Sequence, residues 1–319
     1  MSRPEERKAG WWLPLFGFIS AACMAPESEE ELGQVEQAIE EGDPAASWMR
    51  ASTVAFDYVH SGLCTGTLVS SRHVLTAKHC NPADEGWNTL IGAQVMYYPA
   101  THYVAAPTGV HVASVEFQNA DLLLVELDAS MSGFPSLKPA VMAWEYVPSS
   151  GFRVGAGNHN DEPNPNFTLL SAPGQAFLEE EIDDRFWVSF PLSNGGDSGG
   201  PFYTGDAHRV LGTLTGSRNN PYDIYESVPP RLNSILSAMQ YAWPGNPQTG
   251  GRRIAAASNK QVFNTSSQQV CRYACDMTDE PGSAFQCKAY NYNQVSATCE
   301  LLNVTPTPTS SWLWVTATR

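Results

Sequence analysis

The placement of cysteines constrains the fold of this chain more than any other feature. Without Cys23, near the N-terminus, six cysteines remain, and four of them crowd into the last fifty residues: Cys64, Cys80, Cys271, Cys275, Cys287 and Cys299. Six cysteines can pair in fifteen ways, but this clustering favours one disulfide in an N-terminal region and two in a C-terminal one. Disulfides persist in oxidising compartments, so we expect an exported protein.

Residues 1–22 are typical of a secretory signal, because basic residues precede an apolar stretch at 11–22 that ends in small residues. The stretch is shorter than the roughly 20 residues of a membrane-spanning helix. Cys23 follows where a bacterial lipoprotein would be acylated, and the alternative is that Cys23 is only the tail of the signal and is removed with it or remains as a spare thiol. We therefore expect a secreted or cell-surface protein that meets a membrane only through such a lipid anchor.

The net charge of the chain argues against nucleic acids as partners. The chain has 33 acidic and 18 basic residues and a net charge of -15, and a surface of that sign repels the phosphates of nucleic acids. The acidic residues concentrate between 27 and 43, and such blocks usually stay solvated. Residues 23–38 are therefore predicted to be an acidic spacer or propeptide.

Residues 39–243 contain short apolar and β-branched runs separated by Gly, Pro, Asn and Asp, at 64–69, 74–77, 88–91, 122–127, 186–190 and 210–215. Repeated short strands with turn residues between them indicate a β-sandwich or β-barrel. One helix is predicted at 230–241, where apolar residues recur at spacings of three and four. The region is thus predicted to be an all-β domain closed by a helix.

A second, smaller domain is predicted at the C-terminus. Residues 244–252 combine Pro and Gly in a way that suits neither a helix nor a central strand, so this stretch is interpreted as a linker. Residues 253–319 are few for a core of their own, and their four cysteines would supply the missing stability.

Three segments carry candidate catalytic residues. In Thr-Ala-Lys-His79-Cys80, a disulfide at Cys80 would anchor a histidine. Asp121 opens a strongly apolar run, and if that run is buried its carboxylate needs a partner such as a protonated imidazole. Ser198 lies in Asn-Gly-Gly-Asp-Ser-Gly-Gly-Pro, where glycines allow backbone N–H groups to point at a bound oxyanion.

Together these segments resemble the motifs of the chymotrypsin-like (trypsin-like) serine proteases, in that family's order of His, Asp and Ser. The resemblance implies a double six-stranded Greek-key β-barrel with a C-terminal helix and a serine endopeptidase acting on proteins or peptides. It implies a nucleophile at Ser198, a general base at His79 and an orienting carboxylate at Asp121. It also implies an oxyanion hole from the N–H groups of Gly196 and Ser198, and requires neither metal nor organic cofactor.

The same resemblance implies an activation step. In the family, a newly freed N-terminus inserts its ammonium beside the Asp that precedes the catalytic Ser, so cleavage after Ala38 would pair Ile39 with Asp197. The match is partial, since Glu40 and Glu41 replace residues of the usual Ile-Val-Gly-Gly, and the alternative is that residues 39–43 simply extend the spacer.

Substrate specificity is expected to depend on three residues that align with the family's specificity pocket, Leu192, Ser217 and Asp223. Leu192 takes the place of the Asp found in trypsin-like members, which argues against a strict preference for Arg or Lys. Asp223 could restore some basic preference. On balance the sequence favours an apolar or mixed preference.

The C-terminal cysteines, with the spacing Cys-x3-Cys-x11-Cys, resemble a PAN/Apple domain, a small disulfide-rich α+β fold. The resemblance implies the pairs Cys271–Cys299 and Cys275–Cys287 and a protein or carbohydrate ligand. The alternative role is a mere stability cap.

Three functions remain open. The first is a secreted or surface-anchored serine protease targeted by its C-terminal module. The second is a catalytically inert adhesion or recognition protein on a protease scaffold, and a third reading, within enzymes, is an esterase using the same residues.

Overall fold

The computed structural model describes residues 39, 42–58, 62–81, 90, 92–146, 150–157, 168–178, 184–217, 222–241, 246–248, 252–254, 260–265, 267–278, 285–303, 308–310 and 314–318. The predicted signal sequence, Cys23 and the spacer up to residue 38 lie outside the described residues. Within the described part of the chain, no helix is both long and apolar enough to cross a membrane.

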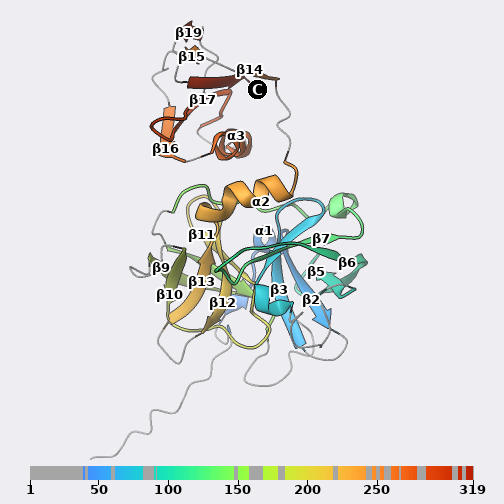
Figure 1. The fold of residues 1–319 in the computed structure, drawn as a ribbon. Coiled ribbons are helices and arrows are strands. Elements are labelled where there is room, and N and C mark those ends of the chain that lie inside the picture. Colours follow the sequence, from blue (N-terminus) through green and yellow to red (C-terminus); the bar gives the residue numbers. More distant parts are fainter. Residues whose placement is uncertain are drawn as a thin grey trace, which may run out of the picture. The chain divides into compact units, whose positions relative to one another are not determined.

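The first barrel is a closed antiparallel sheet with the strand order β2-β3-β4-β7-β6-β5. This is a Greek key, because β4 pairs with β7 rather than with its successor in the chain. Figure 1 shows this barrel in blue to green. Its strands are β2 (Thr53–Tyr58), β3 (Gly62–Leu68), β4 (His73–Thr76), β5 (Gln94–Tyr97), β6 (Val104–Glu116) and β7 (Leu123–Leu127).

Alternation along these strands builds the barrel core. Val54 and Phe56, two apart on β2, are both fully buried and pack with Val74, Val95 and Val125 from three other strands. Successive side chains of a strand point to opposite faces, so every second residue reaches the interior. The predicted strands at 64–69, 74–77 and 122–127 correspond to β3, β4 and β7, whereas most of the strand predicted at 88–91 lies outside the described residues.

The second barrel is formed by six strands with the order β9-β10-β13-β12-β11-β8 and closes through pairing of β8 with β9. The short β1 (Asp43–Pro44) adds to β9 at its edge. In its core the ring of Phe186 stacks on Tyr225, and Phe202 packs edge-on against both. The six strands are β8 (Ser150–Gly155), β9 (Leu170–Leu178), β10 (Arg185–Ser189), β11 (Pro201–Thr204), β12 (Val210–Ser217) and β13 (Tyr222–Ser227).

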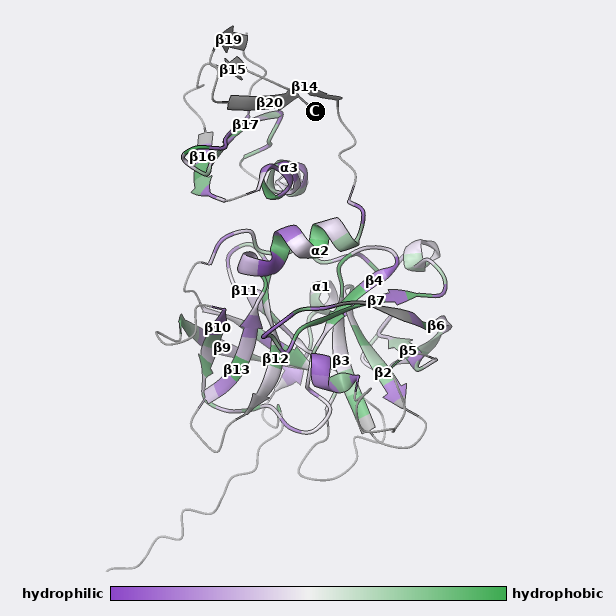
Figure 2. Cartoon of the chain, in the orientation of Figure 1, coloured by the Kyte–Doolittle hydropathy of each residue, from purple (hydrophilic) through white to green (hydrophobic). Residues whose placement is uncertain are grey.

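Two short α-helices accompany the barrels. Helix α1 (Ser47–Arg50) precedes β2, and α2 (Leu232–Ala238) follows the second barrel. The helix predicted at 230–241 is shorter in the structure, because its first two residues belong to the 3₁₀ turn Pro229–Arg231 and α2 ends at Ala238. Leu232, Ile235 and Leu236 of α2 are fully buried, and Figure 2 shows hydrophobic residues next to hydrophilic ones along this helix.

The C-terminal domain is a five-stranded antiparallel sheet with the order β14-β20-β17-β18-β16, accompanied by the helix α3 (Gln268–Met277). A two-stranded sheet joins β15 to β19. The strands are β14 (Asn246–Gln248), β15 (Arg252–Ile254), β16 (Lys260–Asn264), β17 (Ala289–Asn293), β18 (Thr298–Leu302), β19 (Pro308–Ser310) and β20 (Trp314–Thr318).

Strand β14 lies inside the stretch interpreted from its composition as a linker, so the sheet begins earlier than predicted. Residues 246–248 pair with β20 and occupy the edge of the sheet. Proline lacks an N–H group and is tolerated at a sheet edge, which explains how Pro247 fits a strand.

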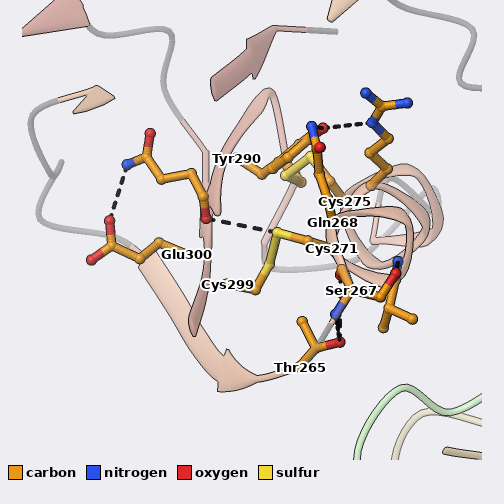
Figure 3. The surroundings of a disulfide bond; sticks show 12 residues. Thr265, Ser267, Gln268, Cys271, Cys275, Tyr290, Cys299 and Glu300 are labelled. Carbon is orange, nitrogen blue, oxygen red and sulfur yellow. Dashed lines mark hydrogen bonds between the residues drawn. A yellow bond between two sulfur atoms is a disulfide. The ribbon is translucent and has the colours of Figure 1, made fainter. Parts of the chain in front are cut away.

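Three disulfides join the six cysteines as Cys64–Cys80, Cys271–Cys299 and Cys275–Cys287. The two C-terminal pairs are those that the resemblance implies. Cys271 and Cys275 lie one turn apart on α3, and Figure 3 shows Cys271 bonded to Cys299 of β18. The hydroxyl of Tyr290 on β17 also accepts from Arg272 Nε of α3 at 2.8 Å, so covalent and polar contacts together fasten the helix to the sheet.

Candidate active site

His79 and Asp121 meet at the end of the first barrel. His79 lies in the 3₁₀ turn Lys78–Cys80 directly after β4, and Asp121 lies just before β7. Because β4 and β7 are antiparallel neighbours with Thr76 opposite Leu123, the two segments leave the sheet side by side. The Nδ1 atom of His79 lies 2.6 Å from Oδ2 of Asp121, and the backbone N–H of His79 donates to Oδ1 at 2.8 Å.

These two hydrogen bonds fix the imidazole in one orientation. A carboxylate that accepts from Nδ1–H leaves Nε2 as the proton acceptor. Burial acts to raise the pKa of Asp121, but the hydrogen bonds from His79 and Thr215 and the imidazole charge outweigh it and hold that pKa below its usual value. Asp121 is therefore an ionised carboxylate at neutral pH.

Thr215 is a site residue that the sequence reasoning missed. It lies on β12, in the other barrel, and its hydroxyl donates to Oδ2 of Asp121. The oxygen that faces His79 is thus held from a second direction. The only signal in the sequence was a hydroxyl near the end of the predicted strand 210–215, which does not identify a partner 94 residues away.

Ser198 lies in the turn between β10 and β11 and is held against the first barrel. The backbone N–H of Thr65 on β3 donates to the carbonyl of Ser198 at 2.8 Å. The Sγ atom of Cys80, next to His79, lies 3.8 Å from the same carbonyl oxygen. The structure thus brings the turn that carries Ser198 to the segment that carries His79.

Glycine is required beside Ser198 for two reasons. Gly199 has a φ of +79°, and a Cβ atom there would lie 2.1 Å from Oγ1 of Thr76 and 2.3 Å from the carbonyl of Thr65. Both the backbone angle and the contact exclude larger residues. Close approach of the two barrels at this point therefore depends on Gly199.

The turn before Ser198 presents backbone donors. Gly196 has a φ of +99°, which favours glycine, and its carbonyl accepts from the hydroxyl of Thr65 at 2.9 Å. Within the part of the chain that the structure describes, the N–H groups of Gly196 and Ser198 make no hydrogen bond, and none joins the hydroxyl of Ser198 to His79. Catalytic hydrogen bonds are often long before a substrate binds.

Asp197 is buried and meets the residue predicted to be the new N-terminus. Its carboxylate accepts from the N–H groups of Gly157 at 2.7 Å and Asn194 at 2.9 Å, and also from that of Ile39. Ile39 itself is 3% exposed and packs against Leu170. Burial raises the pKa of Asp197 to about 7, against the effect of these N–H donors.

The three residues predicted to determine specificity do not share one environment in the structure. Leu192 packs against the cluster of Ile39, Leu170 and Ala172, and Ser217 is the strand partner of Asp223. Asp223 is fully buried and forms an ion pair with Arg153 at 2.5 Å. The sequence analysis did not identify Arg153 as the partner of Asp223. Its position in the apolar segment Gly-Phe-Arg-Val-Gly was a signal, because an arginine that is buried there needs an acidic partner.

Among the described residues, no group of three or more His, Cys, Asp or Glu could hold a metal ion. The titratable groups brought together at the barrel junction are instead an Asp–His pair beside a serine, with Asp197 buried one residue before it.

Comparison with known proteins identifies the family to which the chain belongs. The family model described as Trypsin matches residues 39–235, and the PAN domain model matches residues 248–312. No curated protein matches the chain. Among solved structures, the chain is similar to neuropsin, a serine protease expressed in the limbic system of mouse brain, with 19% identity and a TM-score of 0.49 over 62% of this chain and 99% of that one.

The match to the Trypsin model covers more than half of the chain and coincides with the two closed barrels. The protein therefore belongs to the trypsin family and carries a PAN domain after its protease domain.

Proposed function

We propose that this protein is an active serine endopeptidase with Ser198 as its nucleophile. The observation that carries the proposal is the double hydrogen bond between His79 and Asp121, beside the turn that holds Ser198. This arrangement leaves Nε2 of His79 able to accept the proton of the Ser198 hydroxyl. Its oxygen then attacks the carbonyl carbon of the scissile peptide bond.

Charge develops on the substrate oxygen in that step. We assign its stabilisation to the N–H groups of Gly196 and Ser198, whose orientation is supported by the positive φ of Gly196. The His79 imidazolium gives its proton to the leaving amine, and the acyl group stays on Ser198 as an ester. A water molecule, deprotonated by His79, then hydrolyses the ester and restores the free hydroxyl.

The proposal includes activation by cleavage between Ala38 and Ile39. Ile39 is already buried beside Leu170 and its backbone N–H already contacts Asp197, which supports the assignment of Ile39 and Asp197 as the activation pair. Cleavage would convert that N–H into an ammonium, and a cation next to a buried carboxylate stabilises its ionised form.

The uncleaved chain should lose stability as pH rises. The folded pKa of Asp197 is about 7 against an ordinary value of 3.8, so the native state binds this proton more tightly than the unfolded state. The stabilisation is complete below about pH 4 and is lost as pH rises through 7. A rise from 3.8 to about 7 corresponds to about 4 kcal/mol of unfolding free energy.

Urea unfolding of the uncleaved Ser198→Ala chain between pH 4 and 8 measures this loss, with Ser198→Ala/Asp197→Asn as the comparison. The difference in unfolding free energy between the two should change across this range by up to about 4 kcal/mol. Parallel curves would show that Asp197 does not titrate there.

We further propose that the protease is exported and that its PAN domain binds a protein or carbohydrate that directs it to substrates. Three disulfides in the described residues support an oxidising compartment. Acylation of Cys23 remains a proposal for surface anchoring, and export without a lipid is its alternative. Mass spectrometry of the mature N-terminus separates the two.

A fluorophosphonate probe tests the proposed activity, because it reacts with an activated serine and forms a stable ester. The processed protein should be labelled, and peptide mass spectrometry should locate the label on Ser198. Peptide-amide and ester substrates then separate a protease from an esterase. If a folded chain that starts at Ile39 is not labelled, the protein is instead an inert recognition module.

A further inference from the structure

A fully buried ion pair lies beneath the segment that leads to the nucleophile. Arg153 on β8 and Asp223 on β13 are both 0% exposed, and Nη1 of Arg153 lies 2.5 Å from Oδ2 of Asp223. Burying two charges has a large desolvation cost. A hydrophobic pair of similar volume would often be at least as stable there, so the pair suggests a role beyond stability.

Both members of the pair form hydrogen bonds with the same five-residue segment, residues 189–193. Arg153 donates to the carbonyls of Ser189 at 2.5 Å and of Phe190, and Asp223 accepts from the N–H of Leu192 at 3.3 Å and the hydroxyl of Ser193. Residues 189–193 directly precede the turn that presents Ser198. The ion pair therefore sets the course of the chain into the active site.

Phe190 shows that this course is strained. It has a φ of +60°, although it is not glycine, and such an angle is unusual for a bulky residue. The residue is 73% exposed, so side-chain packing does not account for the conformation. The hydrogen bond from Arg153 to its carbonyl holds the residue in place, and strain of this kind is typical of functional sites.

Asp223 also meets the other segment that borders the nucleophile. Ser217 is its partner across β12 and β13, and Thr215, two residues earlier, contacts Asp121. Asp223 thus touches residues 192–193 on one side and lies opposite residue 217 on the other. A substrate side chain that extends from Ser198 between these two segments would approach Asp223 and Arg153.

We propose that Arg153 cancels the charge of Asp223 at the end of the site for the P1 residue, the substrate residue whose carbonyl Ser198 attacks, and thereby restricts the enzyme to uncharged P1 side chains. This inference rests on the proposed protease activity. A carboxylate that binds a basic P1 side chain must be free to accept from it. Here the guanidinium, the Ser193 hydroxyl and the Leu192 N–H already occupy Asp223.

The two buried charges act on a substrate through the low-dielectric protein interior rather than by direct contact. A lysine or arginine at P1 would be repelled by Arg153 and a glutamate by Asp223, and an apolar side chain avoids both repulsions. Arg153 is thus assigned as a specificity-determining residue. Its effect should appear in the ratio of substrates cleaved rather than in overall activity alone.

Coumarin-amide peptides that differ only at P1, with Phe, Leu, Lys, Arg or Glu, test the inference on protein that the fluorophosphonate probe labels. The wild type should cleave after Phe or Leu with kcat/KM at least about tenfold above that after Lys or Arg. Arg153→Met should raise the ratio of Lys and Arg cleavage to Phe cleavage at least about tenfold, because it leaves Asp223 unpaired.

Two further variants sharpen the test. Arg153→Met/Asp223→Leu removes both charges and should restore the preference for uncharged P1 residues. Arg185→Met is the matched control, since it breaks another arginine–carboxylate pair, Arg185 of β10 with Glu226 of β13 at 2.6 Å, and should leave the P1 profile unchanged.

If Arg153→Met does not fold, Asp223→Asn replaces it, because an uncompensated guanidinium should raise the ratio of Glu to Phe cleavage. A wild type that prefers Lys or Arg, or folded charge variants with the wild-type profile, would overturn the inference while fluorophosphonate labelling still upholds the protease activity. If the wild type is not labelled at all, the proposed function fails and the inference fails with it.

Discussion

A Ser198→Ala variant is expected to hydrolyse peptides about 10⁴- to 10⁶-fold more slowly than the processed wild type. Alanine removes the oxygen that attacks the scissile carbonyl, so no acyl-enzyme can form. The fold should be unaffected, because within the described residues the contacts that hold Ser198 involve its carbonyl and not its hydroxyl. Values of kcat/KM for a coumarin-amide peptide measure the loss, and thermal unfolding confirms that the variant is folded.

Ser71→Ala is the matched control for this variant. Ser71 lies in the short turn before β4 and contributes its carbonyl, not its side chain, to a hydrogen bond with Met131. It should retain wild-type activity. If Ser198→Ala stays within tenfold of the wild type, Ser198 is not the nucleophile and the proposed mechanism is wrong.

Asp121→Asn is expected to lower kcat/KM by about 10⁴-fold at neutral pH. An asparagine amide can donate to Nδ1 of His79, which would leave the proton on Nε2 and make the imidazole unable to accept from Ser198. The loss of the carboxylate also removes the charge that stabilises the imidazolium. The side chain keeps its size, so the effect should appear in the rate and not in the melting temperature.

The structure offers a matched control for this change as well. His111 and Asp128 form a second histidine–carboxylate pair, with Nδ1 and Oδ1 3.0 Å apart, but both side chains are more than half exposed. Asp128→Asn should therefore leave kcat/KM unchanged. A similar loss in both variants, or less than a tenfold loss in Asp121→Asn, would contradict the role of Asp121.

Much of the candidate site was predictable because its chemistry lies in short segments. His79 follows a strand and precedes a disulfide cysteine, Asp121 lies just before a strand, and Ser198 lies among glycines. Each of these contexts is local, so residue type and neighbours were enough. Several strands were predictable for the same reason, since β3, β4, β7, β10 and β12 all correspond to predicted apolar runs.

Other features depended on contacts that no local pattern contains. Thr215 reaches Asp121 from the other barrel, and Pro247 joins a sheet because it meets β20 at an edge that needs no N–H group. In both cases the partner lies 70 or more residues away in the chain, so the contact exists only once the sheets have formed.

Asp223 shows most clearly which features the sequence determined and which depended on the tertiary structure. The sequence established an acidic residue close to the expected specificity site, together with the order of His79, Asp121 and Ser198. The tertiary structure decided that Arg153 lies 2.5 Å from that carboxylate. The charge that a substrate meets is a sum over groups that folding brings within a few ångströms, and burial removes the water that would otherwise screen each of them.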